Sequence, residues 1–251
     1  KLYIQGIEIK GAERLSQREL RKEMMLKKRG FLSWLTGKGV LREELLDRDA
    51  AAIEAYYANK GFIDARVGQP EVEYGEEGIF LTFYVEEGPR YKAGEVAFTG
   101  ALLESEKDLL EIISMDELAQ EQEYFNQSIM RQDLQNLENF YTDFGYAFAE
   151  ADVEMDVDRE EHVVDLVYAL SKGNKIYINR VETEGNYRTR DNVILREMRL
   201  SDGDLFSGTA LRRSNERLEK LDFFETVEIE PVPTSEEDEI DLVVRVREEP
   251  T

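Results

Sequence analysis

The chain contains no cysteine among its 251 residues, and this absence excludes disulfide bonds, thiolate metal ligands and a cysteine nucleophile. It also contains a single histidine, His162, so neither a catalytic triad nor a histidine-based metal site follows from the sequence. We interpret His162 as an isolated surface residue. Because an oxidising compartment permits disulfides without requiring them, the lack of cysteine leaves the redox compartment open.

Basic residues and long apolar runs are also scarce. The 32 Lys and Arg stand against 55 Asp and Glu, and the net charge of −23 argues against a phosphate-binding surface, so we expect no nucleic-acid partner. The same charge favours a monomer that stays in solution. No stretch approaches the roughly 18 apolar residues of a membrane span, and no signal-peptide pattern opens the chain, which we interpret as a piece of a longer precursor.

What the chain does contain is a pattern that occurs three times. Alternating strand-like residues lead to a glycine in Ile7-x-Ile9-x-Gly11, in Val96-x-Phe98-x-Gly100 and in Val181-x-Thr183-x-Gly185. Each copy is followed by helical patterns, a turn flanked by aromatic residues and two further strand-like runs. This aromatic turn lies within residues Tyr57 to Phe62, Tyr141 to Tyr146 and Leu218 to Phe224. Units of this size are typical of tandem small domains rather than of a short-period solenoid. We therefore predict three domains, at residues 1–90, 91–173 and 174–251.

Each unit has a predicted first helix with a recognisable start. Ser16-Gln17-Arg18-Glu19 fits a capping box, in which the Ser hydroxyl accepts from a free amide of the first turn and the Glu side chain reaches back to the amide of the cap residue. Ser105 and Thr189 occupy the equivalent places in the other two units. The sequence therefore predicts that these three residues cap their helices.

The second predicted helix of each unit carries an apolar stripe and ends at a turn. In the third unit Ser214 stands at an apolar position of the stripe, so we expect weaker packing or a partner there. Gly61 and Gly145 end their helices, where a residue with positive φ is favoured. Asp222 takes that place in the third unit, at a cost on the order of 1 kcal/mol.

Two strand-like runs close each unit, and the last of them alternates apolar and polar residues, as from Ile79 to Val85. A right-handed crossover would place this last strand parallel to the first and both helices on one face of the sheet. The strand after the aromatic turn is then left at an edge. The sequence thus predicts an α+β fold of three tandem domains, each of the β-α-α-β-β type with a three-stranded mixed sheet.

Acidic residues are abundant, but they form no recognisable catalytic or metal site. Asp152 to Asp158 places carboxylates on one face of a strand and Glu236 to Glu239 forms a loop run, yet neither has the spacing of a calcium loop. An acidic hydrolase stays open as an alternative on composition, and a pocket with convergent carboxylates would be its signature. We expect no enzyme activity, no metal and no cofactor.

The run that follows the first aromatic turn has the character of an edge strand. Val67-Gly68-Gln69-Pro70-Glu71-Val72 favours a bulge at an edge, because Pro cannot donate to a strand ladder. Such an edge is either protected from pairing or used for it, and the sequence leaves both open. Upstream lies an apolar connector, for which packing on its own domain is favoured over docking on a partner. Its apolar residues are Phe31, Leu32, Trp34 and Leu35.

The three units resemble polypeptide-transport-associated (POTRA) domains. The third, with Gly185-Asn-Tyr-Arg-Thr, Arg196-Glu-Met-Arg199 and Phe223-Phe-Glu-Thr-Val227, is similar to the barrel-proximal domain of BamA-type outer-membrane assembly factors. The first two units are similar to the third and fourth of the five domains in that family. A related translocation and assembly factor, which carries three such domains before its barrel, is the nearest alternative.

The resemblance implies a scaffold and chaperone arm in the periplasm of a Gram-negative bacterium, attached to a C-terminal β-barrel in the outer membrane. Its implied partners are accessory lipoproteins and unfolded outer-membrane proteins, the latter guided by addition of a strand at a free edge. The residues that match the strand-pairing edge are Arg66, Val67, Gly68, Gln69, Pro70, Glu71, Val72, Glu73 and Tyr74. Those that match the lipoprotein contact are Asp202, Gly203, Arg196 and Arg199.

Overall fold

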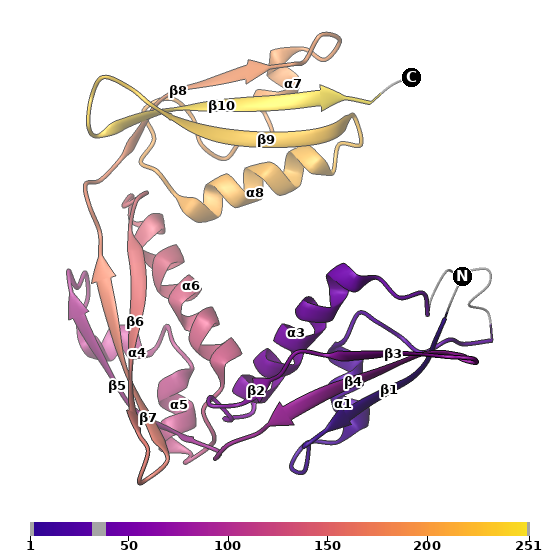
Figure 1. Cartoon of the computed structure of the whole chain (residues 1–251). Coiled ribbons are helices and arrows are strands. Elements are labelled where there is room, and N and C mark those ends of the chain that lie inside the picture. The colour runs from indigo at the N-terminus through magenta and orange to yellow at the C-terminus, as the bar shows by residue number, and fades with distance from the viewer. Residues whose placement is uncertain (1–2, 32–38, 250–251) are drawn as a thin grey trace. The chain divides into compact units, whose positions relative to one another are not determined.

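The computed structural model describes residues 3–31 and 39–249, and its strands form three sheets (Figure 1). The first sheet and its helices comprise β1 (Ile4–Lys10), α1 (Gln17–Glu23), the 3-10 helix η1 (Glu43–Leu45), α3 (Leu46–Asn59), β2 (Arg66–Val67), β3 (Glu71–Gly75) and β4 (Gly78–Glu86). The middle sheet and its helices comprise β5 (Lys92–Gly100), α4 (Glu106–Leu110), α5 (Met115–Gln120), α6 (Gln127–Asp143), β6 (Glu150–Asp158) and β7 (Val163–Ser171). The third sheet and its helices comprise β8 (Tyr177–Glu184), α7 (Asp191–Leu195), α8 (Gly208–Glu219), β9 (Phe224–Pro233) and β10 (Glu239–Glu248). The predicted α+β class with three sheets is confirmed. Among the described residues, the middle unit has three helices where two were predicted, and the edge strand of the first sheet is divided into β2 and β3.

Each sheet has its last strand in the middle. The orders are β1-β4-β2, with β3 also paired to β4, then β5-β7-β6 and β8-β10-β9. β1 runs parallel to β4, and β8 runs parallel to β10, whereas β3 and β9 run antiparallel to their central strands. These pairings confirm two predictions for the first and third sheets: the first and last strands are parallel, and the strand after the aromatic turn lies at an edge.

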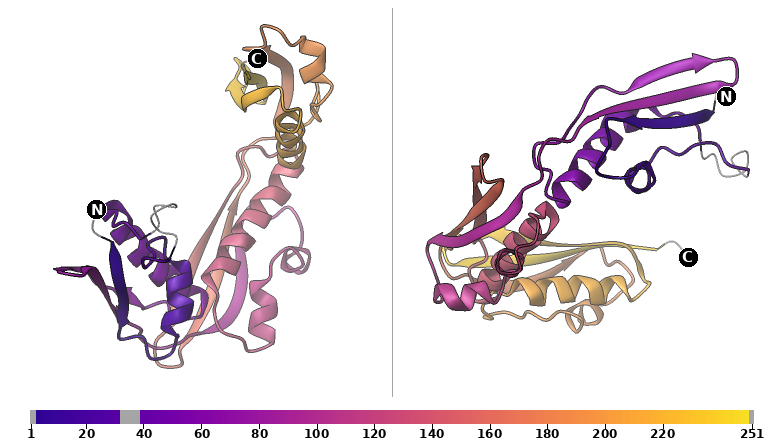
Figure 2. Two further views of the ribbon diagram at one scale, coloured as in Figure 1. Left: turned by 90° about the vertical axis from the view of Figure 1, so that its right-hand side faces the viewer. Right: turned by 90° about the horizontal axis from the view of Figure 1, so that it is seen from below.

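The first sheet buries only one of its faces. Every second residue of β4 from Ile79 to Val85 is buried and belongs to a core with Leu20 of α1 and Tyr57 of α3. Both helices lie on this side of the sheet (Figure 2). The residues between point the other way, and Phe80 and Tyr84 stay 39% and 40% exposed. The opposite face of this sheet is therefore open.

The chain divides into two compact units. Unit 1 consists of Lys1–Val96, Ser114–Arg131 and Met155–Leu166, and unit 2 consists of Ala97–Ile113, Gln132–Glu154 and Val167–Thr251. The first sheet lies in unit 1 and the third sheet in unit 2, while the strands of the middle sheet contribute residues to both. The predicted domain boundaries after residues 90 and 173 stay a prediction.

Two of the three predicted helix caps are confirmed. The Ser16 hydroxyl accepts from the amide of Glu19, and the Glu19 carboxylate accepts in return from the amide of Ser16 at 3.0 Å, so the capping box is complete. Ser105 caps α4 in the same sense, with its hydroxyl accepting from the amide of Asp108. The sequence pattern was sufficient at these two starts because all the partners lie within one turn.

The predicted cap at Thr189 is wrong. The N-cap residue of α7 is Arg190, and its side chain makes no capping hydrogen bond. The amide of Thr189 donates instead to the carboxylate of Glu248 at 2.7 Å. The Thr189 side chain also hydrogen-bonds to Glu248, so it is directed to the end of β10 and not to the first turn of α7.

The ends of the second helices follow the predicted turn. Gly61 and Gly145 have φ of +91° and +94°, and Asp222 has φ of +52°. Asp222 therefore occupies the left-handed region that the alignment of the repeats assigned to it. Its conformation carries the strain expected of a residue with a Cβ at such a position.

Three polar side chains are buried among the second helices: Asp49, Asp133 and Ser214 are each 0% exposed. The Ser214 hydroxyl accepts from the amide of Arg199 at 2.7 Å and donates to the carbonyl of Ala210 at 2.8 Å. The expected external partner at Ser214 is therefore absent for this side chain, which is buried and bonded within the fold, while the expected weaker packing stays a prediction. The hydroxyl is satisfied inside the fold, as buried polar groups generally are.

Candidate functional site

The predicted edge strand is present, but it is divided. β2 and β3 both pair with β4, and residues 68–70 between them lie outside any strand. The amide of Gly68 still donates to the carbonyl of Tyr84 at 2.9 Å, so the chain leaves the ladder at Gln69 and Pro70. Gly and Pro thus interrupt the edge as predicted, and the longer segment beyond the interruption is β3.

β3 has a strand partner on one side only among the described strands. It pairs with β4 through the short loop Glu76-Glu77, with Gly75 opposite Gly78. In such a hairpin the residues that flank the loop exchange hydrogen bonds, and every second residue along the strand then points its amide and carbonyl outwards. In β3 the outward residues are Val72 and Tyr74. An added strand would bind to these backbone groups.

A hydrogen bond from β4 towards β1 agrees with this alternation. Ile79 stands opposite Tyr74, and its amide donates to the carbonyl of Tyr3 at 2.9 Å, on the side of β1. The amide of Val67 in β2, by contrast, donates to the carboxylate of Glu54 in α3 at 2.7 Å. A side chain of this unit therefore occupies an amide of β2, while β3 offers its outer edge.

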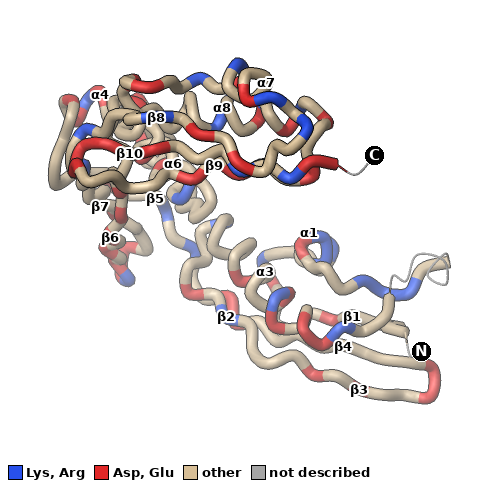
Figure 3. Tube along the Cα trace, turned by 90° about the horizontal axis from the view of Figure 1, so that it is seen from above, with Lys and Arg blue, Asp and Glu red and all other residues tan. Residues whose placement is uncertain are grey.

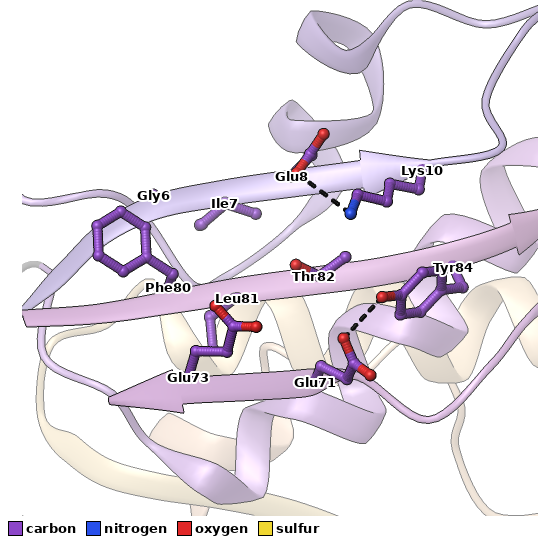
Figure 4. A pocket seen from close by; sticks show the side chains of 10 residues that line it. All are labelled: Gly6, Ile7, Glu8, Lys10, Glu71, Glu73, Phe80, Leu81, Thr82 and Tyr84. Carbon is purple, nitrogen blue, oxygen red and sulfur yellow. Dashed lines mark hydrogen bonds and ion pairs between the residues drawn. The ribbon is translucent and has the colours of Figure 1, made fainter. Parts of the chain in front are cut away.

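The open face beside β3 forms a hollow with a volume of about 390 Å³ (Figure 4). The strand register places Glu8 of β1, Thr82 of β4 and Glu71 of β3 in one row across the sheet. Along β4, Phe80 and Tyr84 stand on either side of Thr82. The residues that line the hollow are Gly6, Ile7, Glu8, Lys10, Glu71, Glu73, Phe80, Leu81, Thr82 and Tyr84.

Carboxylates outnumber cations in this hollow. Glu8, Glu71 and Glu73 line it together with Lys10, whose ammonium lies 3.9 Å from the Glu8 carboxylate and 5.8 Å from the centre of the Tyr84 ring. The Tyr84 hydroxyl donates to Glu71 at 2.6 Å, and this hydrogen bond raises the pKa of the Tyr84 phenol because it stabilises the protonated form. Acidic residues also occupy the turn that joins β3 to β4 (Figure 3).

Sequence reasoning named Glu71 and Glu73 but missed the aromatic residues beside them. Phe80 and Tyr84 lie on β4, outside the predicted site, and only the register brings them next to β3. One signal could have found them. The alternation that predicted the buried residues of β4 also assigns Phe80 and Tyr84 to the opposite face, where two aromatic residues are unusual for a solvated surface.

The residues predicted to bind a lipoprotein lie near the third sheet. The carboxylate of Asp202 accepts from the amide of Val181 at 2.9 Å, and Gly203 has φ of +84°. Arg196 pairs with a neighbouring carboxylate at 3.3 Å, and the amide of Arg199 donates to a buried hydroxyl. Over residues 3–31 and 39–249, no hydrogen bond or ion pair joins Asp202 to either arginine. Their role stays a prediction.

The apolar connector is described at one of its four predicted residues. Phe31 is 96% exposed, so packing on its own domain does not hold for this side chain. The other three residues, Leu32, Trp34 and Leu35, lie outside the described residues.

His162 is exposed, as predicted, although it is not isolated. It lies in the turn before β7 with φ of +54°, and its ring meets the ring of Tyr91 edge-on at 5.4 Å between centres. In the part of the chain that the structure describes, no three His, Asp or Glu side chains gather in an arrangement suited to a metal ion. No helix within the same residues is long and apolar enough to cross a membrane.

Comparison with known proteins gives one family. The model of the POTRA family, described as a surface antigen variable number repeat, matches residues 2–88, 91–173 and 176–249. The chain is 49% identical over its whole length to an outer membrane protein assembly factor BamA of Nitratidesulfovibrio vulgaris, and 30% identical over 99% of its length to that of Neisseria meningitidis serogroup B. It spans 32% and 31% of these two proteins, about a third of each.

Solved structures show the same fold. The crystal structure of POTRA domains 3 to 5 of BamA from Haemophilus influenzae matches with a TM-score of 0.79 and 22% identity, over 98% of this chain and 96% of that one. BamA from Haemophilus ducreyi without POTRA domains 1 to 3 matches with a TM-score of 0.56 and 25% identity, over 63% of this chain and 30% of that one.

Proposed function

The chain belongs to the POTRA family, and on this premise we propose that it is a non-catalytic scaffold and chaperone arm for the assembly of outer-membrane β-barrel proteins. The resemblance of its three units to those of BamA-type factors is confirmed. In the proposal the arm works in the periplasm, binds accessory lipoproteins, and guides unfolded outer-membrane proteins by strand addition. The names of its relatives, which are assembly factors, support this role over that of an acidic hydrolase.

The observation that carries the proposal is the outer edge of β3. The outward amides and carbonyls of Val72 and Tyr74 have no strand partner within the described part of the chain. Backbone groups make no demand on the sequence of the strand that they bind, so one edge can serve many clients. The interruption at Pro70 limits the length of this edge, which restrains uncontrolled association of copies.

A titration of backbone amides by NMR tests the proposal. An unfolded peptide from a strand of an outer-membrane β-barrel is added to the chain, and we expect the largest shifts at Val72, Tyr74 and their neighbours. Tyr74→Pro removes an outward donor but no hydrogen bond to β4, so binding should weaken about fivefold to tenfold. Tyr74→Ala is the matched control, because it loses the same side chain and keeps the donor.

Two outcomes would contradict strand addition at β3. One is the absence of shifts in β3 at millimolar peptide. The other is equal affinity of Tyr74→Pro and Tyr74→Ala for the peptide. In either case β3 would not be a client edge, and the first repeat would be a scaffold and spacer.

Lipoprotein binding is tested separately at Asp202. Since its carboxylate holds the amide of Val181, Asp202→Ala would disturb the loop as well as any contact. Asp202→Asn keeps an acceptor oxygen and removes the charge. We expect Asp202→Asn and Arg196→Ala to lower the yield of accessory lipoproteins that co-purify with the full-length protein. An unchanged yield in both variants would rule out this contact.

A further inference from the structure

Two aromatic side chains that lie outside the core line the hollow beside β3. Phe80 and Tyr84 project from the open face of β4 with Thr82 between them (Figure 4). Gly6 of β1 lies opposite Phe80, and a Cβ added to Gly6 would stand 2.9 Å from the Phe80 ring. The absence of a side chain at Gly6 therefore lets the ring lie against the sheet. Thr82 is small enough to leave room between the two rings.

Carboxylates from β1 and β3 line the hollow on either side of β4. Glu8 of β1 and Glu71 of β3 both lie opposite Thr82 of β4, and Glu73 of β3 lies opposite Phe80. The ammonium of Lys10 already lies between the Glu8 carboxylate and the Tyr84 ring, so this face accommodates a cation. Aromatic faces and carboxylates both attract cations, and a guanidinium can stack on the former while it donates to the latter.

A strand added at β3 would direct side chains into this hollow. Its residue opposite Glu73 would point to the open face, because directly opposed residues in a sheet share a face. Directly opposed Cβ atoms lie about 5 Å apart, and a long side chain reaches the next strand. An arginine at that position would place its guanidinium over β3, beside Glu71 and Glu73. It would meet the rings of β4 there, because the Tyr84 hydroxyl lies 2.6 Å from Glu71 and the Phe80 ring lies 3.7 Å from a Cβ built at Gly75 of β3.

We propose that the hollow receives an arginine side chain from a protein strand that adds to β3. This inference rests on the proposed strand addition and makes it selective. The backbone of β3 accepts any extended segment, and the hollow favours segments with arginine at the position opposite Glu73. Lysine fits less well, since its ammonium cannot stack and donate to two carboxylates at once.

The test compares two peptides that differ in charge alone. Both are strands of about seven residues that alternate Thr and Val, a typical strand length. One carries arginine at the centre, and the other carries citrulline, which has the same shape without the charge. Binding to the whole chain is measured by NMR titration. We expect the arginine peptide to bind about tenfold more tightly than the citrulline peptide.

Variants separate the hollow from the general negative charge of the chain. Glu73→Gln and Phe80→Leu should each bring the affinity ratio of the two peptides towards one. Glu237→Gln removes one charge from an exposed loop of unit 2 and should leave the ratio unchanged. An amide spectrum of each variant verifies that it is folded.

The outcomes distinguish the two proposals. If both peptides bind β3 with equal affinity, strand addition stands and the arginine site is wrong. If Glu237→Gln lowers the ratio as much as Glu73→Gln, the preference reflects long-range attraction, and the site is again wrong. If neither peptide binds at millimolar concentration, both proposals fail.

Discussion

In the first repeat, at residues 2–88, the carboxylate of Asp49 accepts from the amides of Met25 and Leu26 at 2.7 and 2.8 Å. In the third repeat, at residues 176–249, the hydroxyl of Ser214 accepts from the single amide of Arg199 at 2.7 Å. Each side chain projects from the second helix and holds the chain that follows the first helix. In both repeats a buried acceptor on the second helix thus binds this segment, and the acceptor is charged in the first repeat and neutral in the third.

At the loop that follows the first strand, the two repeats use the same contact, a carboxylate that accepts from backbone amides. The carboxylate of Glu87 accepts from the amides of Glu13 and Arg14, both at 2.9 Å. The carboxylate of Glu248 accepts from the loop after β8 in the same way. This loop follows the first strand of each repeat, and a carboxylate at the end of the last strand fastens it. The repeats thus differ in the buried acceptor on the second helix and share the carboxylate at the end of the last strand.

The largest expected effect is that of Asp49→Ala. It leaves two amides without an acceptor in a buried site, which should cost about 3 to 5 kcal/mol. Faster hydrogen exchange in α1 and α3, with exchange in α8 unchanged, would report it. Asp47→Ala is the control on the same helix, because Asp47 is exposed. Equal protection in the two variants would show that the buried carboxylate does not hold the first repeat together.

A pH titration examines the feature that the repeats share, the carboxylate that binds the loop after the first strand. Burial opposes ionisation of Glu248, but hydrogen bonds from Thr189 and Arg188 outweigh it and lower the pKa from 4.5 to about 2. A lowered pKa means that the contribution to stability is complete above about 4.5 and is lost as the pH falls towards about 2.

Hydrogen exchange near α7 should therefore accelerate within this window in the unaltered chain. In Glu248→Gln the acceleration attributable to this group should be absent, whereas Glu237→Gln on an exposed loop should keep it. Identical pH dependence in the two variants would mean that Glu248 does not fasten the loop.

Ser214→Ala is expected to have a smaller effect than Asp49→Ala. It removes one acceptor and leaves one partly buried amide unsatisfied, which should cost about 1 to 2 kcal/mol. Exchange in α7 and α8 measures the loss, and Ser207→Ala would be a poor control because Ser207 caps α8. Ser235→Ala, on an exposed loop, is suitable. If Ser214→Ala cost as much free energy of unfolding as Asp49→Ala, the neutral and the charged acceptor would stabilise their repeats equally.

The smallest expected effect is a gain in stability. Asp222→Gly relieves a side chain at φ of +52° and should stabilise the third repeat by about 1 kcal/mol. The reverse change in the first repeat has the opposite sign, because a Cβ at Gly61 would lie 2.8 Å from the carbonyl of Tyr91. A lower melting temperature of Asp222→Gly would contradict the equivalence of the two turns.

Local patterns in the sequence were enough to predict several features of the fold and the site. The capping box at Ser16, the left-handed turn at Asp222 and the interruption of the edge at Pro70 are all present. Each involves partners a few residues apart, so spacing alone identifies them. The cap at Thr189 failed because its side chain, like its amide, hydrogen-bonds to Glu248, a residue 59 positions away.

The sequence by itself determined the three repeats, the parallel pairing of first and last strands in the first and third repeats, and the alternation of each closing strand. These follow from the periods of helices and strands, which are properties of the local backbone. Only the tertiary structure decided that Asp49 meets the amides of Met25 and Leu26, and that Glu8, Thr82 and Glu71 share a row. Such neighbours come from strands and helices far apart in the chain, and their register depends on how the whole sheet packs against its helices.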